Sequence, residues 1–246
     1  MKKRLLQLLA DNRRRPGARF QIAVDQDEPT IYLYDVIVGS EIEAEWFGGV
    51  APLTFIKELA SLDAARIHLR INSPGGDVFG ARAMQQALRE HPAQIVVHVD
   101  GWAASAASVV MLAGDDVIIS DGGMVMIHKA WTLAIGNSDE MLHTAALLEK
   151  IDATLAESYA NRGRKDASYF AEAMAAETFY TAAEAVEVGL ADRIAETEPI
   201  DAQATGIDWD LRALGRATAG RKPPPPAASA RDFYERRQHF FETIAA

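Results

Sequence analysis

The stretch that decides the fold runs from Asp100 to His128 and reads DGWAASAASVVMLAGDDVIISDGGMVMIH. An apolar run ends just before Asp100, small residues surround Ser105, and a second apolar run leads to His128. We interpret Ser105 as lying at the start of a helix, where unpaired backbone N–H groups and the helix dipole favour a developing negative charge. The stretch therefore predicts a serine nucleophile near a histidine base.

Outward from this stretch, segments typical of strands alternate with segments typical of helices. The predicted strands span 31–38, 66–72, 95–99, 117–119, 124–127 and 191–194, with an extended piece at 177–180. The predicted helices span 51–62, 78–91, 103–113, 137–162, 166–176 and 181–189. This alternation indicates one α/β domain of stacked βαβ or ββα units, which we place at residues 21–198.

The helix at 137–162 is long, and its start is well marked. Asn137 followed by Glu140 is a capping box, and a stripe of apolar residues continues to Tyr159. At 1.5 Å per residue such a helix is about 33 Å long, enough to project from a small domain. Its apolar stripe is expected to pack on its own domain or on a neighbouring subunit.

Composition restricts the class of protein. The chain has 246 residues, no cysteine and a net charge of −10, which excludes disulfides and cysteine nucleophiles and argues against a nucleic-acid-binding surface. No apolar run is long enough to span a membrane, so we expect a cytoplasmic protein. Residues 1–20 form a basic arm and residues 199–246 a tail with a proline-rich linker at 223–226, either of which could remain solvated or dock on a partner.

The candidate site has several competing residues. Ser108 lies one turn beyond Ser105 and is expected in the core. Of the six histidines only His128 follows a strand and precedes an irregular segment, as a base at a cleft must. The Gly75-Gly76 pair breaks a strand and can leave backbone amides free for a carbonyl oxygen. The orienting acid stays open at this point, and a Ser–Lys dyad through Lys129 is a remote alternative.

Four motifs, in order, resemble the Clp protease proteolytic subunit family. They are INSPGG at 71–76, GWAASAA at 101–107, MIH at 126–128 and FYTAAEAVEVGLAD at 179–192. The match covers roughly residues 30–196. The residues SPGGDV, DGWAASAAS and ETFYTA within it are most similar to the ClpP-like head maturation (prohead) proteases of tailed phages and prophages.

The resemblance implies the ClpP/crotonase fold, with a handle helix starting at Asn137 that joins subunits across rings. It implies Ser105 as nucleophile, His128 as base and the amides of the Gly75-Gly76 turn and of Ala106 as oxyanion hole. The family's acid falls on Glu177, where the family has aspartate.

The implied activity is that of a serine endopeptidase without metal or cofactor, in a homo-oligomeric ring that cleaves capsid or scaffold protein. If phage-encoded, it would act in the cytoplasm of the bacterial host. Alternatives are a degradative subunit fed by a AAA+ unfoldase and an inactive ring that serves in assembly. The serine and histidine motifs argue against the acyl-CoA chemistry of crotonases.

Overall fold

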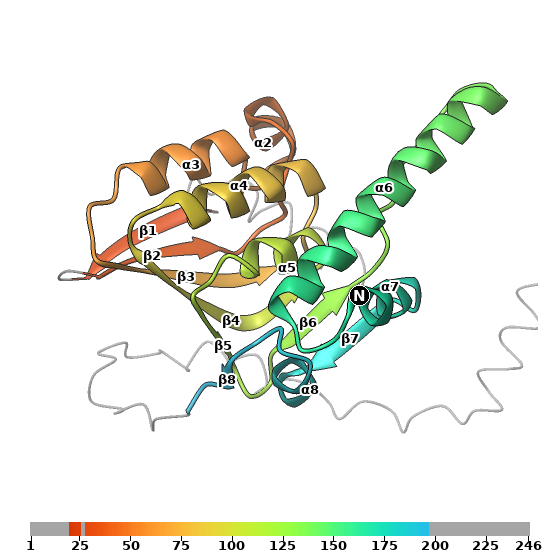
Figure 1. Cartoon of the computed structure of the whole chain (residues 1–246). Coiled ribbons are helices and arrows are strands. Elements are labelled where there is room, and N and C mark those ends of the chain that lie inside the picture. Colours follow the sequence, from red (N-terminus) through yellow and green to blue (C-terminus); the bar gives the residue numbers. More distant parts are fainter. Residues whose placement is uncertain (1–19, 26–27, 197–246) are drawn as a thin grey trace, which may run out of the picture. The chain divides into compact units, whose positions relative to one another are not determined.

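The computed structural model describes residues 20–25 and 28–196 (Figure 1). The predicted tail at 199–246 lies outside these residues, as does the predicted basic arm except for its last residue, Phe20. The proposed domain boundaries therefore remain predictions.

A mostly parallel sheet forms the centre of the described domain. The strands are β1 (Phe20–Asp25), β2 (Glu28–Leu33), β3 (Arg66–Ser73), β4 (Gln94–Ala104), β5 (Asp116–Ile119), β6 (Met124–Ile127), β7 (Thr178–Thr181) and β8 (Arg193–Ile194). They follow the order β1-β2-β3-β4-β5-β8, while β6 pairs with β4 and β7. The β1–β2 and β6–β7 pairs are antiparallel and the others are parallel. The predicted α/β fold class is confirmed.

The domain has helices on one face of this sheet and beside its β7–β8 end (Figure 1). They are α2 (Glu41–Phe47), α3 (Pro52–Ala60), α4 (Val78–Glu90), α5 (Ala106–Met111), α6 (Ser138–Arg162), α7 (Ala167–Ala175) and α8 (Ala182–Glu187). Figure 1 shows α3, α4 and α5 along the same side of the central strands. The alternate residues Ile67, Leu69 and Ile71 of β3 are fully buried, as are Met84 and Leu88 of α4. The apolar side chains that alternate along the strand and those on one face of the helix thus pack in the same core.

Strand β4 is longer than the sequence pattern indicates. Its first part, Val96–Val99, pairs with β5, and its last part, Trp102–Ala104, pairs with β6. The helix predicted over 103–113 therefore begins only at Ala106. Alanines suit a helix by local propensity, but here pairing with β6 on one side and Ser73 on the other holds them extended.

The structure differs from the sequence-based expectation at three further places near the start of the domain. The strand predicted at 31–38 ends at Leu33, and only Ile37 forms bridges beyond it. Strand β1 and helix α2 were not predicted. Helix α2 has no buried residue, and its apolar side chains Ile42, Trp46 and Phe47 are exposed, so it does not contribute to the core.

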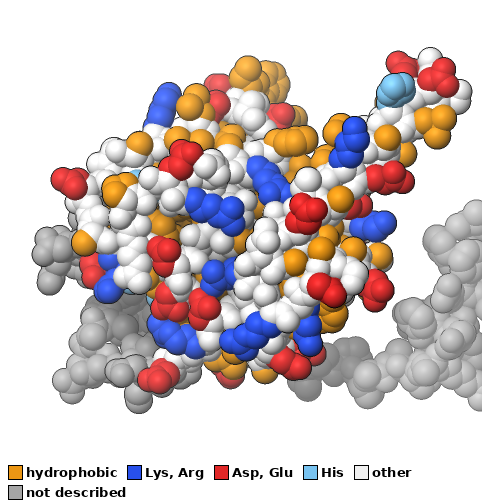
Figure 2. All heavy atoms as spheres, in the orientation of Figure 1, with side chains coloured by type: hydrophobic (Ala, Val, Ile, Leu, Met, Phe, Trp, Pro, Cys, Tyr) orange, Lys and Arg blue, Asp and Glu red, His pale blue; other side chains and the backbone are white. Residues whose placement is uncertain are grey.

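Helix α6 begins at the predicted capping box, where Asn137 and Glu140 bond each other reciprocally. Only Leu155, Ala156 and Tyr159, near its C-terminal end, are buried. The other end projects (Figure 1), and hydrophobic side chains appear along it and over α2 in Figure 2. No helix in the described part of the chain is both long and apolar enough to cross a membrane.

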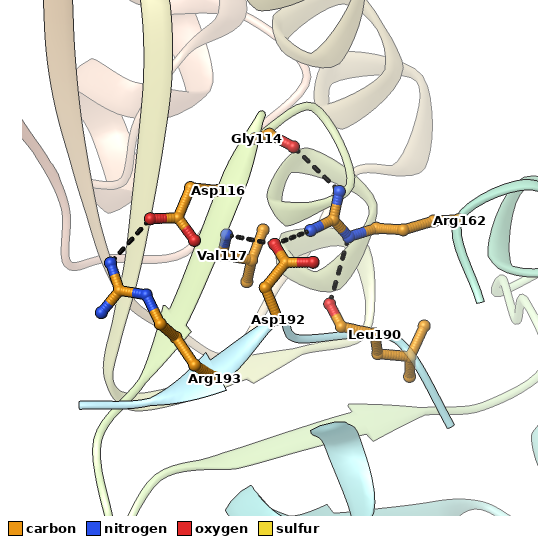
Figure 3. Close-up of polar contacts among 7 residues, drawn as sticks. All are labelled: Gly114, Asp116, Val117, Arg162, Leu190, Asp192 and Arg193. Atoms are coloured by element: carbon orange, nitrogen blue, oxygen red, sulfur yellow. Dashed lines mark hydrogen bonds and ion pairs between the residues drawn. The ribbon is translucent and has the colours of Figure 1, made fainter. Parts of the chain in front are cut away.

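The packed end of α6 is fixed by Arg162 (Figure 3). Its guanidinium donates to the Gly114 carbonyl at 2.8 Å, to the Leu190 carbonyl at 3.3 Å and to Asp192 at 2.6 Å. The same Asp192 oxygen accepts from the Val117 amide of β5 at 2.7 Å. Arg162 therefore connects α6 to β5 and to the turn before β8.

Candidate active site

Three parallel strands end at the same edge of the sheet and bring the predicted site residues together. Strand β3 leads into Pro74-Gly75-Gly76, β4 leads into Ser105, and β6 leads into His128. Because β4 is the neighbour of both β3 and β6, the three strand ends are adjacent. Carboxyl ends of parallel strands are a common place for binding sites in α/β proteins.

Ser105 and His128 are joined by a hydrogen bond. The distance from Ser105 Oγ to His128 Nε2 is 2.7 Å, and both residues are partly exposed. For this nitrogen to accept the hydroxyl proton, the ring must carry its own proton on Nδ1. A histidine in that tautomer can activate the hydroxyl as a nucleophile.

The backbone of Ser105 is strained. Its φ of 52° and ψ of −124° lie outside the regions that L-residues favour, at a cost of about 1–3 kcal/mol. The Ser105 amide donates to the Met126 carbonyl of β6 at 2.8 Å, which fixes the turn. A sharp, strained turn between a strand and a helix is how α/β hydrolases expose a nucleophilic serine.

Two backbone amides beside the serine are open. The N–H groups of Gly76 and Ala106 have no protein acceptor within residues 28–196. The Gly75 amide, predicted as a further donor, instead donates to Ser73 Oγ at 3.1 Å. Gly75 has another role: with φ at +88°, a Cβ there would lie 2.7 Å from the Ala106 nitrogen and cover that amide.

Glu177 is close to His128 in the strand register but is not bonded to it. The last antiparallel pair of β6 and β7 is Ile127 with Thr178, so the next residues in line are His128 and Glu177. Glu177 has a φ of 51° and an exposed side chain. Within the described residues no hydrogen bond or ion pair joins its carboxylate to the histidine. The role of Glu177 stays a prediction.

The segment after His128 is held to α6 and α7. The Lys129 amide donates to the Met174 carbonyl at 3.2 Å, and the Ala130 amide donates to Asp152 of α6 at 2.8 Å. The Lys129 side chain is exposed and makes no hydrogen bond to Ser105 in the described structure, which leaves the Ser–Lys alternative without a contact. The backbone around His128 is thus fixed by neighbouring helices.

A cleft of about 710 Å³ surrounds the Ser105–His128 pair. Its walls are mainly apolar and include Val38, Phe79, Leu133, Leu148 and Ile151. Glu43 and Asp77 also line it, and both carboxylates accept backbone amides, of Gly39 at 3.0 Å and Gly80 at 2.6 Å. A mainly apolar cleft with a few polar groups is typical of a binding site. Within residues 28–196 no group of three metal-ligating side chains is arranged to hold a metal ion.

Two residues in contact with this site were not predicted as functional. Ser108 was expected in the core, and it is fully buried, but its hydroxyl also donates to the Ser105 carbonyl at 2.6 Å. Tyr159 was part of the apolar stripe of α6, and its hydroxyl lies 2.7 Å from Ser108 Oγ. The sequence shows that Ser108 follows Ser105 by three residues, one helical turn. It does not show that Ser108 contacts Tyr159, which lies 51 residues further along the chain.

A mostly parallel α/β fold with a serine–histidine pair beside open amides is an arrangement that hydrolases acting through a serine use. Comparison with known proteins makes the assignment specific. The Clp protease family model matches residues 34–198, and the chain belongs to this family of peptidases.

Individual relatives agree with the family match. An ATP-dependent Clp protease proteolytic subunit of Pleurastrum terricola is 31% identical over 136 residues, covering 54% of this chain and 69% of that protein. Proteolytic subunit 1 of Rhodococcus jostii (strain RHA1) is 32% identical over 149 residues, covering 59% and 68%. The subunit of Deinococcus radiodurans is 25% identical over 165 residues, covering 65% and 78%.

Proposed function

We propose that this chain is a serine endopeptidase with Ser105 as nucleophile and His128 as general base. The observation that carries the proposal is the 2.7 Å contact between Ser105 Oγ and His128 Nε2 at a strained strand-to-helix turn. His128 takes the hydroxyl proton as Ser105 attacks the peptide carbonyl, and then returns it to the leaving amine. Water releases the acyl group by the same steps in reverse.

The amides of Gly76 and Ala106 are the proposed oxyanion donors. Both are free of protein acceptors and adjoin Ser105, and Gly75 leaves the Ala106 amide uncovered. Such donors stabilise the tetrahedral intermediate more than the planar substrate, which is what accelerates acyl transfer.

Glu177 is the proposed orienting acid, on the strength of its register next to His128 and its place in the family motif. The carboxylate must turn toward Nδ1 to serve, and catalytic hydrogen bonds often tighten only in complexes. We expect Glu177→Gln to lower kcat by less than His128→Ala does. An equal loss in the two variants would show that Glu177 is already engaged.

Peptide cleavage tests the central assignment. Wild type is expected to hydrolyse peptides with apolar residues before the scissile bond, and Ser105→Ala to lose that activity. Gly122→Ala is the comparison for a general loss of structure, because a Cβ there meets nothing within 4 Å. Activity retained in Ser105→Ala would contradict the proposal, and a wild type inactive in every assembly state would favour the inactive ring.

For the biological role we propose head maturation in a tailed phage or prophage, with capsid or scaffold protein as substrate. The residues SPGGDV at 73–78, DGWAASAAS at 100–108 and ETFYTA at 177–182 support it. The basic residues 1–20 and the proline-linked tail also support it, since they offer docking sequences outside the peptidase domain. A homo-oligomeric ring is part of the proposal. The large apolar side chains of Trp131, Leu133 and Ile135 support it, because they are exposed and close together in the chain, and exposed apolar patches mark interaction sites.

A second role is favoured by the names of the relatives, which are ATP-dependent Clp protease subunits. In that role the ring degrades proteins delivered by a AAA+ unfoldase. Digestion of purified capsid and scaffold proteins, with and without an unfoldase and ATP, separates the two. Specific cuts without ATP support maturation, whereas processive degradation only with both additions supports the degradative role.

A further inference from the structure

The carbonyl of Ser105 is held by a buried pair of hydroxyl groups. Ser108 donates to it twice, from its backbone amide at 3.0 Å and from its side-chain hydroxyl at 2.6 Å. Ser108 Oγ in turn lies 2.7 Å from the hydroxyl of Tyr159. Ser108 is fully buried and Tyr159 is 2% exposed, so water does not replace either contact.

The direction of these hydrogen bonds follows from the number of protons. A serine hydroxyl has one proton, and Ser108 gives it to the Ser105 carbonyl, which can only accept. The Tyr159 hydroxyl must therefore be the donor to Ser108. Burial raises the pKa of Tyr159 to about 12, so the phenol keeps its proton at any pH at which the enzyme would work.

The helix turn that carries Tyr159 is itself fixed. Arg82 of α4 donates to Ser158 at 2.9 Å and to Thr154 at 3.2 Å. The Tyr159 ring packs against Phe170 of α7 with centroids 5.8 Å apart. The donor is thus anchored from two sides, and hydrogen bonds in such a buried chain strengthen one another.

We infer that Tyr159 and Ser108 form a relay of positioning residues that holds the strained Ser105 turn in its reactive conformation. The inference rests on the proposed function, since it assumes that Ser105 is the nucleophile. Removing either hydroxyl lets the Ser105 carbonyl rotate, so that Ser105 Oγ and the Ala106 amide no longer face the substrate carbonyl together. Tyr159 also lines the cleft, but Tyr159→Phe keeps its ring, so substrate binding is expected to change little.

The test compares Tyr159→Phe, Ser108→Ala and the double variant, measured by peptide turnover and by the rate of phosphonate labelling at 25 °C. Each single variant is expected to lose about five- to tenfold in kcat and in labelling rate, with KM within twofold of wild type. Because Tyr159 acts through Ser108, the double variant should be no slower than Ser108→Ala.

Tyr180→Phe is the matched control. Its hydroxyl is also buried but makes no hydrogen bond within the described residues, so its loss leaves kcat unchanged. Unaltered kcat in Tyr159→Phe, a change in KM alone, or an independent loss in the Ser108→Ala background would each overturn the relay. A different result would show that the proposed function itself is wrong. In that case the wild type would resist phosphonate labelling, or Ser105→Ala would be labelled as fast as the wild type.

Discussion

Replacing Gly76 with alanine tests the oxyanion hole through backbone geometry alone. Gly76 has a φ of +138°, and a Cβ built on it would lie 2.0 Å from the Ile37 carbonyl oxygen. Real Cβ atoms do not approach closer than 3.0 Å, so the turn must move by about 1 Å. That movement opposes two hydrogen bonds, from the Ile37 amide to Gly75 at 2.7 Å and from the Asp77 amide to Ile37 at 2.9 Å.

The displaced amide should no longer reach the oxyanion. Loss of one such donor costs about 10²–10³ in turnover, or about 2.7–4 kcal/mol of transition-state stabilisation. We therefore expect Gly76→Ala to lower kcat by at least about 10² while His128 and Ser105 stay in contact. Steady-state hydrolysis of a fluorogenic peptide gives kcat and KM, and circular dichroism reports whether the variant is folded.

Gly122→Ala is the control, because a Cβ at that turn meets nothing within 4 Å. It should keep kcat within twofold of wild type. A folded Gly76→Ala variant with kcat within threefold of wild type would refute the assignment of the Gly76 amide as an oxyanion donor.

Three further predictions concern stability, each measured by urea denaturation. Arg162→Met should lower the free energy of unfolding by about 2–3 kcal/mol, because it leaves two carbonyls and Asp192 without their donor. Arg193→Met removes an exposed ion pair and should cost under about 1 kcal/mol. Equal losses in the two variants would contradict the reasoning. Tyr180→Phe should stabilise by about 1 kcal/mol because it removes an unsatisfied buried hydroxyl; a destabilised variant would mean that the hydroxyl has a partner. Burial, and secondly the charge of Arg70, lowers the pKa of His98 from 6.5 to about 4. As pH drops from 6.5 to about 4 the unfolded state therefore binds the proton first, and the free energy of unfolding should fall. His98→Gln should weaken this pH dependence, and an unchanged dependence in that variant would count against the prediction.

The sequence was sufficient where the signals are local. The capping box at Asn137, the length of α6 and the strand end before His128 depend on residues close in the chain, and the structure has all of them as expected. Such features are set by short-range hydrogen bonds and by apolar periodicity.

The remainder depends on contacts between distant residues. The extension of β4 through Ala104 is decided by its pairing with β6, against the helix propensity of its alanines. The link from Tyr159 to Ser108 joins two helices, and a stripe pattern cannot separate a tyrosine that only packs from one that also donates. The orientation of Glu177 follows from a left-handed backbone that a motif does not specify.

Mapping a phosphonate adduct on the wild-type protein tests the central claim most directly. Tryptic cleavage after Arg89 and Lys129 releases one peptide that holds Ser105, Ser108 and Ser120, and fragmentation of this peptide locates the adduct. We predict a single adduct on Ser105 that disappears in His128→Ala. An adduct on another serine, or labelling of Ser105 that does not require His128, would contradict the account.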